Sequence, residues 1–87
     1  MSVYMVERDL SGIAMHALSD AQKAAIATAA EMREHGSQIS YLRSLFSPED
    51  GRCMCMFEAD DEADVRRLND HAGLPYHNVV PALDLTP

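Results

Sequence analysis

The sequence predicts a single α+β domain in which four short strands and two helices follow one another in the order βαββαβ. Three observations predict it. The chain has 87 residues, which leaves room for one hydrophobic core and no second one. Segments with the two-residue period of strands alternate with segments whose apolar residues recur every three or four. The four glycines fall between these segments, where turns form most easily: Gly12, Gly36, Gly51 and Gly73.

The first part of the chain predicts a strand and then a long helix. Val3–Asp9 starts with β-branched and aromatic residues and is apolar on both faces, as in a strand covered on both sides. Met15–His35 has apolar or small residues at helical spacing and much alanine. The helix starts either at Met15 or at Ser19, where Ser19 and Gln22 would form a capping box. Gly36 is expected to end the helix.

The middle of the chain predicts a hairpin. Ile39–Phe46 alternates, with Tyr41 and Arg43 assigned to one face. Pro48–Gly51 supplies a turn. The second arm, Arg52–Ala59, again has largely apolar residues on both faces.

The last part predicts a short helix and a final strand. Asp60–Glu62 places negative charge where a helix N-terminus favours it, and an apolar stripe follows until Gly73 and Pro75. Tyr76–Leu85 is expected to be an edge strand, because Pro81 lies inside it.

This order is the split βαβ, or ferredoxin-like, arrangement of an antiparallel sheet. Right-handed crossovers put both helices on one face of the sheet. The first and third strands are apolar on both faces and are therefore expected in the centre, with a far side that one copy cannot cover. We expect residues 1–87 to form one domain that pairs sheet to sheet as a homodimer.

Composition limits the partners and the compartment. The formal net charge of -7 argues against nucleic acid as a partner, because few cations are available to neutralise phosphates. The chain has no apolar run long enough for a signal peptide or a membrane span, so we expect no membrane association. Two cysteines suit a reducing compartment and free thiols. The expected location is cytoplasmic.

Six residues are candidate metal ligands. Cys53 and Cys55 would be soft donors on one strand face, although unpaired cysteines are more often buried as small hydrophobes. Imidazole suits nickel, zinc and copper, although each histidine alone is more often solvated or capping; the candidates are His16, His35, His71 and His77. A twofold axis could bring equivalent side chains of two copies to one ion.

Three polar residues interrupt otherwise apolar strands and are candidate ligand-binding residues: Arg43, Tyr41 and Glu7. A charge in such a strand must be paired or must contact a ligand. The alternatives are an internal ion pair of Arg43 with Glu7 or Glu58, or contact of Arg43 with a bound molecule.

Several segments together resemble a family of small bacterial ferredoxin-like proteins, long described as a domain of unknown function, one branch of which binds nickel. They are Tyr4–Leu10, Tyr41–Ser44, Arg52–Ala59, Ala72–Pro75 and Ala82–Pro87. The resemblance implies a homodimer that holds nickel ions at its surface, for sequestration or tolerance, with no reaction assigned. Many relatives place histidines at the positions of Arg43 and near Leu68, beside a cysteine that matches Cys55; both histidines are missing here.

Two functions follow as hypotheses. The first is a dimeric protein without catalysis that binds nickel or another divalent transition metal. The alternative is a small dimeric α+β-barrel enzyme or small-molecule-binding protein with a pocket at Tyr41, Arg43 and Cys55.

Overall fold

The strands and helices follow in the expected order. The computed structural model describes residues 1–87. Its elements are β1 (Ser2–Asp9), α1 (Met15–Glu34), β2 (Ile39–Phe46), β3 (Arg52–Ala59), α2 (Glu62–His71) and β4 (Asn78–Ala82). The prediction of an α+β fold with four strands and two helices is therefore confirmed.

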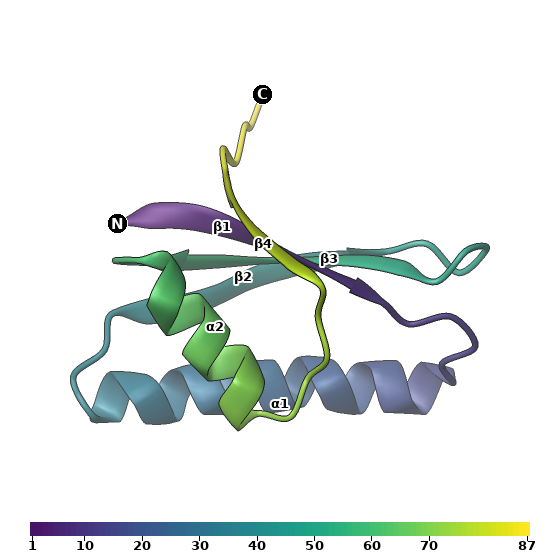
Figure 1. Ribbon diagram of the computed structural model, residues 1–87, viewed down its shortest axis with the longest axis horizontal. Coiled ribbons are helices and arrows are strands. Elements are labelled where there is room, and N and C mark those ends of the chain that lie inside the picture. Colours follow the sequence, from purple (N-terminus) through teal and green to yellow (C-terminus); the bar gives the residue numbers. More distant parts are fainter.

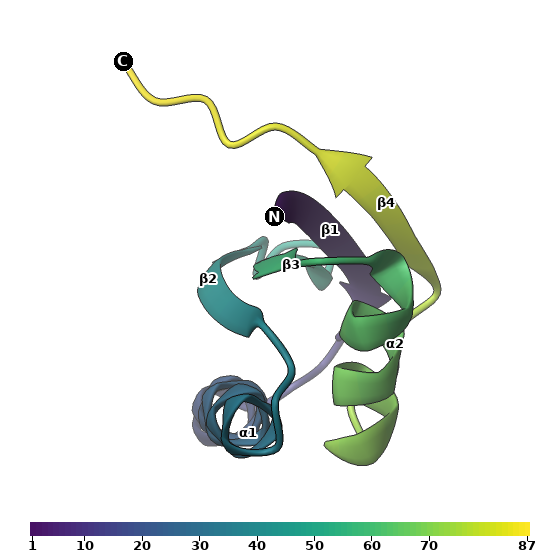
Figure 2. The ribbon, with the colours of Figure 1, turned by 90° about the vertical axis from the view of Figure 1, so that its left-hand side faces the viewer.

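The four strands form one antiparallel sheet in the order β2-β3-β1-β4. The strands that are apolar on both faces, β1 and β3, take the two central positions, as predicted. Both helices lie on the same side of the sheet (Figures 1 and 2). This topology is that of a ferredoxin-like domain. No helix combines the length and hydrophobicity that crossing a bilayer requires.

The core lies between the sheet and the helices. Val6 on β1 and Phe57 on β3 are fully buried there, and α2 adds Val65 and Leu68. The long helix contributes small residues, with Ala25 and Ala29 almost fully buried. Alanine has no side chain beyond Cβ, so α1 can pack closely on the sheet and still leave space where larger side chains are missing.

The opposite side of the sheet has no helix over it (Figure 2). Met5 pairs with Met56 on β3 and with Val80 on β4, and Leu45 pairs with Met54. Directly opposite residues share a face, so these side chains gather on one surface, which we call the open face. A single copy leaves Leu45 65% exposed.

The two hairpin arms meet in a tight turn after β2. Gly51 has φ +77°, and a Cβ atom there would overlap the backbone of Ser11. Leu10 donates its N–H to the Gly51 carbonyl at 2.8 Å. Only glycine therefore fits this position without strain or displacement of the neighbouring loop.

Two element boundaries differ in detail from the expectations. Helix α1 starts at Met15, with Ala14 in the N-cap position and no side-chain cap, so Ser19 lies inside the helix. Strand β4 ends at Ala82, whose partner is Val3, the second residue of β1. The chain beyond Ala82 has almost no strand left to pair with, and Figure 1 shows it leaving the sheet.

Strand β4 pairs only with β1, and Tyr4 faces Pro81. The edge position predicted from this proline is confirmed.

Candidate functional site

A cavity of about 350 Å³ lies between α1 and the sheet. Ten of its fourteen lining residues are hydrophobic. Helix α1 contributes Leu18, Ala21 and Ala25, and Phe46 closes it from β2. Its volume lies within the range of ligand pockets, about 300 to 1,000 Å³. The cavity exists because the alanines of α1 do not fill the space above the hairpin.

Arg8 is the charged residue of this cavity, and it was not among the predicted site residues. It lines the cavity from β1 and is 4% exposed. Its guanidinium donates to the Pro75 carbonyl at 3.3 Å and to Asn69 Oδ1 at 2.8 Å. Its Nε has no hydrogen-bond partner, and none of the ion pairs of the chain includes Arg8. A buried guanidinium without a counter-charge is costly and calls for an explanation.

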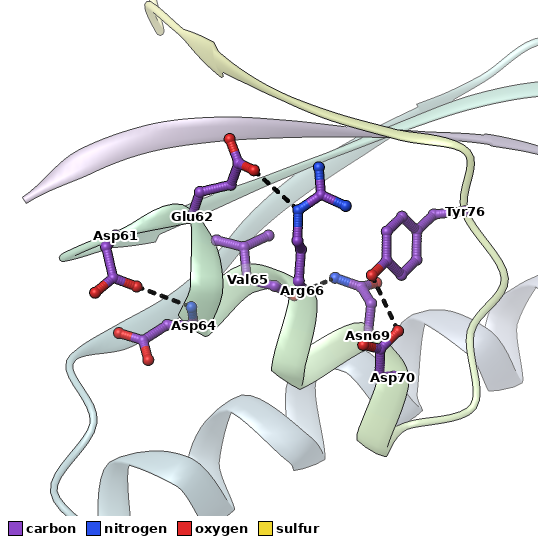
Figure 3. Close-up of polar contacts among 8 residues, drawn as sticks. All are labelled: Asp61, Glu62, Asp64, Val65, Arg66, Asn69, Asp70 and Tyr76. Atoms are coloured by element: carbon purple, nitrogen blue, oxygen red, sulfur yellow. Dashed lines mark hydrogen bonds and ion pairs between the residues drawn. The ribbon is translucent and has the colours of Figure 1, made fainter.

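Asn69 holds Arg8 in place from α2. Its Nδ2 donates to the Val65 carbonyl at 2.8 Å (Figure 3), which turns Oδ1 toward Arg8. The alternation of β1 contained a signal for this site, since Arg8 follows Tyr4 and Val6 on the inward face. A charge at an inward position is the feature that sequence reasoning should have singled out.

The two cysteines lie on the wall of the same cavity, beside Arg8. Their Sγ atoms are 3.8 Å apart, too far for a disulfide bond of about 2.05 Å, and both thiols are free. Burial raises the pKa of Cys53 to about 11; the adjacent Cys55 adds to the rise, and the positive charge of Arg8 opposes it. Cys53 is therefore a protonated thiol at neutral pH, which is a poor metal ligand until a metal displaces the proton.

A row of hydrogen bonds crosses from α1 to the cysteines. Gln22 donates to the Tyr41 hydroxyl at 3.1 Å. The hydroxyls of Tyr41 and Ser44 are 2.6 Å apart, and Ser44 Oγ donates to Cys55 Sγ at 3.0 Å. The Tyr41 ring packs edge-on against Phe57, with centroids 5.5 Å apart. The predicted pocket residues Tyr41 and Cys55 thus do lie together in the cavity.

Arg43 does not lie in this cavity, and its predicted position beside Tyr41 was wrong. The pairing of β2 with β3 shifts by one residue between Tyr41, opposite Phe57, and Arg43, opposite Met56. Such a bulge moves every following residue to the other face. Arg43 therefore points to the open face, where its guanidinium pairs with Asp84 at 2.9 Å.

The expected internal ion pairs of Arg43 with Glu7 or Glu58 do not form either. Glu7 instead accepts a hydrogen bond from Asn78 Nδ2 at 2.9 Å. Asp84 lies in the C-terminal segment beyond β4, which sequence periodicity could not bring next to Arg43.

The four histidines lie on different parts of the surface. His16 is exposed in the first turn of α1, and His77 is exposed before β4. His35 caps the end of α1, and its Nδ1 is 2.9 Å from the Glu31 carbonyl oxygen. His71 ends α2, and its Nε2 lies 3.7 Å from Glu31 Oε1.

The structure thus brings one of the six predicted metal ligands, His71, to the side chain of Glu31, whereas His35 contacts only the Glu31 backbone carbonyl. It brings Cys53 and Cys55 to each other at the cavity wall. No group of three or more histidine, cysteine, aspartate or glutamate side chains is arranged within one copy to hold a metal ion.

Comparisons with known proteins identify a similar solved structure and a matching family. The crystal structure of SCO4226 from Streptomyces coelicolor A3(2) is similar, with a TM-score of 0.80 and 18% sequence identity over 99% of this chain and 100% of that one. No curated protein matches the sequence. A family model described as "Nickel responsive protein SCO4226-like" matches residues 4–81. The chain therefore belongs to the SCO4226-like family of nickel responsive proteins.

Proposed function

We propose that this protein binds nickel, or another divalent transition metal ion, as a homodimer and without catalysis, and so serves in metal sequestration or tolerance. The family description, nickel responsive, supports the choice of metal. The observation that carries the proposal within the chain is the contact of His71 with Glu31 across the two helices.

The junction of α1 and α2 offers nitrogen and oxygen donors that suit nickel. His71 Nε2 and Glu31 Oε1 lie 3.7 Å apart, and both side chains are more than half exposed. A small closing movement would bring both atoms to one ion, with water in the remaining positions. As an uncoordinated surface ion pair, the same contact would contribute little to stability.

His35 is a nearby imidazole, and it completes no group of three donors within one copy. It follows Glu31 by one helical turn, so both lie on the same side of α1. When Nδ1 donates to the Glu31 carbonyl at 2.9 Å, Nε2 is left unprotonated. Metal-binding histidines in proteins are commonly oriented by this kind of hydrogen bond to a backbone carbonyl. We call Glu31 and His71 the helix-end site.

The thiols are the competing location. A metal between Cys53 and Cys55 would have to displace a thiol proton from Cys53, whose pKa is raised to about 11, and would lie near the positive charge of Arg8. We therefore place the ion at the helix-end site, and His16 and His77, which form no ion pair with a carboxylate, are expected to contribute less.

The open face supports the homodimer. Its methionines, Val80 and the exposed Leu45 form apolar surface that the helices of the same copy do not cover, and Glu7, Glu58 and Arg43 lie on the same face. Leu83 and Leu85, just beyond β4, are more than four-fifths exposed. A second copy stacked on this surface would remove it from water, which is the main driving force for such association.

Calorimetric titration of the metal-free protein with nickel tests the proposal. We expect saturable binding that His71→Ala and Glu31→Gln each weaken at least about tenfold, as loss of ligands or of their partners does. His16→Ala, at the other end of α1, is the matched control and should bind like the wild type. Absence of saturable uptake would refute nickel binding. Thiolate-to-nickel absorption bands, lost in a Cys53→Ser, Cys55→Ser protein, would move the site to the cysteines.

A further inference from the structure

We propose that the cavity between α1 and the sheet binds a small monocarboxylic acid with a compact apolar body. The carboxylate would pair with Arg8, and the apolar body would fill the space between Ala21, Ala25 and Phe46. This inference goes beyond metal binding and does not depend on it, because the cavity and the helix-end site share no residue.

Arg8 supplies a buried positive charge that an anionic ligand would neutralise. A guanidinium has five N–H donors, and here two contacts use it, with Pro75 and Asn69. The Nε atom is unpartnered, and the side chain is 96% buried without an anion. A buried cation of this kind is destabilising until an anion neutralises it. The planar fork of arginine fits a carboxylate better than it fits other small groups.

The partners of Arg8 prepare it for binding. The contacts to the Pro75 carbonyl and to Asn69 come from the loop before β4 and from α2, so they hold the guanidinium from two sides. Both are neutral acceptors and leave the positive charge uncompensated. A ligand that meets a fixed guanidinium loses less entropy on binding than one that must order a mobile side chain.

The rest of the lining selects the class of anion. Arg8 is the only charged residue among the fourteen that line the cavity, and ten of these are hydrophobic. One cation and apolar walls suit a single negative charge on an apolar molecule, and disfavour phosphates or polyanions that need several cations. The volume of about 350 Å³ accommodates on the order of ten non-hydrogen atoms, at ~30 Å³ for a water-sized atom in a liquid.

The row of hydrogen bonds from Gln22 to Cys55 does not compete for the charge. The Tyr41, Ser44 and Cys55 side chains bond to one another and to Gln22. Their hydrogen-bonding capacity is therefore largely used within the protein. Arg8 remains the group with unsatisfied donors, and the carboxylate is expected there.

Titration of the metal-free, isotope-labelled protein with benzoate, followed by amide chemical shifts, tests the proposal. We expect saturable shifts around Ala25, Tyr41 and Cys55. Benzamide, a neutral molecule of nearly the same shape, should bind at least about tenfold more weakly, since a hydrogen bond to a charged group contributes about 1.5–3 kcal/mol and 1.4 kcal/mol is tenfold.

Two variants test separately whether binding needs the charge of Arg8 and whether it needs the space of the cavity. Arg8→Met keeps a long apolar side chain and should reduce benzoate affinity at least about tenfold, whereas Arg43→Met, the same change on the open face, should leave it unchanged. Ala21→Phe should fill the cavity and abolish binding while Arg8 stays. If Arg8→Met does not fold, Ala21→Phe and the comparison with benzamide decide. Absence of saturable shifts with both benzoate and octanoate, equal affinity for benzamide, or full binding by Ala21→Phe would overturn the proposal.

Discussion

Replacing Met5 with lysine tests whether a second copy covers the open face. Met5 lies in the middle of this face, opposite Met56 on one side and Val80 on the other. A lysine there would put a charge into the proposed interface without touching the core, because Met5 points away from both helices. The dimer contains the substitution twice, so each effect counts twice.

The expected weakening of the dimer follows from the part of the Met5 side chain that the interface would bury. Removing a methionine side chain fully from water is worth about 1.5–3 kcal/mol. Met5 is already partly buried in one copy, so about 1 kcal/mol per copy remains for the interface, or about 2 kcal/mol per dimer. Each 1.4 kcal/mol changes the dissociation constant tenfold, which gives a dimer weakened about thirtyfold or more. The cost of burying the lysine ammonium adds to this value.

Sedimentation equilibrium over a range of protein concentrations measures the effect. The matched control is Ile26→Lys, which introduces the same charge at an exposed apolar residue on α1, 47% exposed, on the other side of the sheet. We expect Met5→Lys to dissociate and Ile26→Lys to remain a dimer. The same dissociation constant for Met5→Lys and the wild type would refute the reasoning, as would a wild-type protein that is a monomer.

Two further predictions concern stability and reactivity. Asp61 caps α2 by accepting the Asp64 N–H at 3.0 Å (Figure 3). Asp61→Ala should therefore lower the free energy of unfolding by about 1 kcal/mol and lower Tm by roughly 4–8 °C in thermal unfolding. Asp60→Ala removes no cap and should change Tm little. Equal Tm values for the two variants would contradict the assigned cap. The Cys53 pKa of about 11 predicts that its alkylation rate keeps rising with pH well above pH 9. Because the unfolded thiol ionises at lower pH than the folded one, this group stabilises the fold at neutral pH and loses that contribution as pH rises toward 11. Rapid alkylation of Cys53 in the folded protein at pH 7 would be inconsistent with this pKa.

Much of the fold could be predicted because local patterns and global topology agree. Strands β1 and β3 are apolar on both faces, and the sheet places them in its centre. Pro81 required an edge, and β4 is an edge strand. Gly36 follows the last turn of α1, and Gly51 closes the hairpin at positive φ. In each case the local feature suits the place that the fold gives it, so the sequence constrains the structure strongly.

The cavity could be predicted only in part, because a single extra residue in β2 changes the faces of the strand. Strict alternation placed Arg43 beside Tyr41, but the bulge between them sends Arg43 to the open face. Nothing in the local sequence marks this bulge. The arginine of the cavity is Arg8, which alternation did place inward, but its partner Asn69 lies 61 positions away.

The histidines show a similar limit. His35 and His71 belong to different helices, and their common neighbour Glu31 is exposed. Helical periodicity puts Glu31 and His35 on one side of α1, but only the packing of α2 beside α1 brings His71 to them. Exposed residues that meet across two elements leave no signal in the apolar pattern.

The most direct measurement of the proposed function is a nickel-edge anomalous difference map from crystals of the nickel-loaded protein. We expect a peak at the junction of α1 and α2, within bonding distance of His71 and Glu31, from an ion coordinated by nitrogen and oxygen. A peak between Cys53 and Cys55, or nickel confined to His16 or His77, would contradict it.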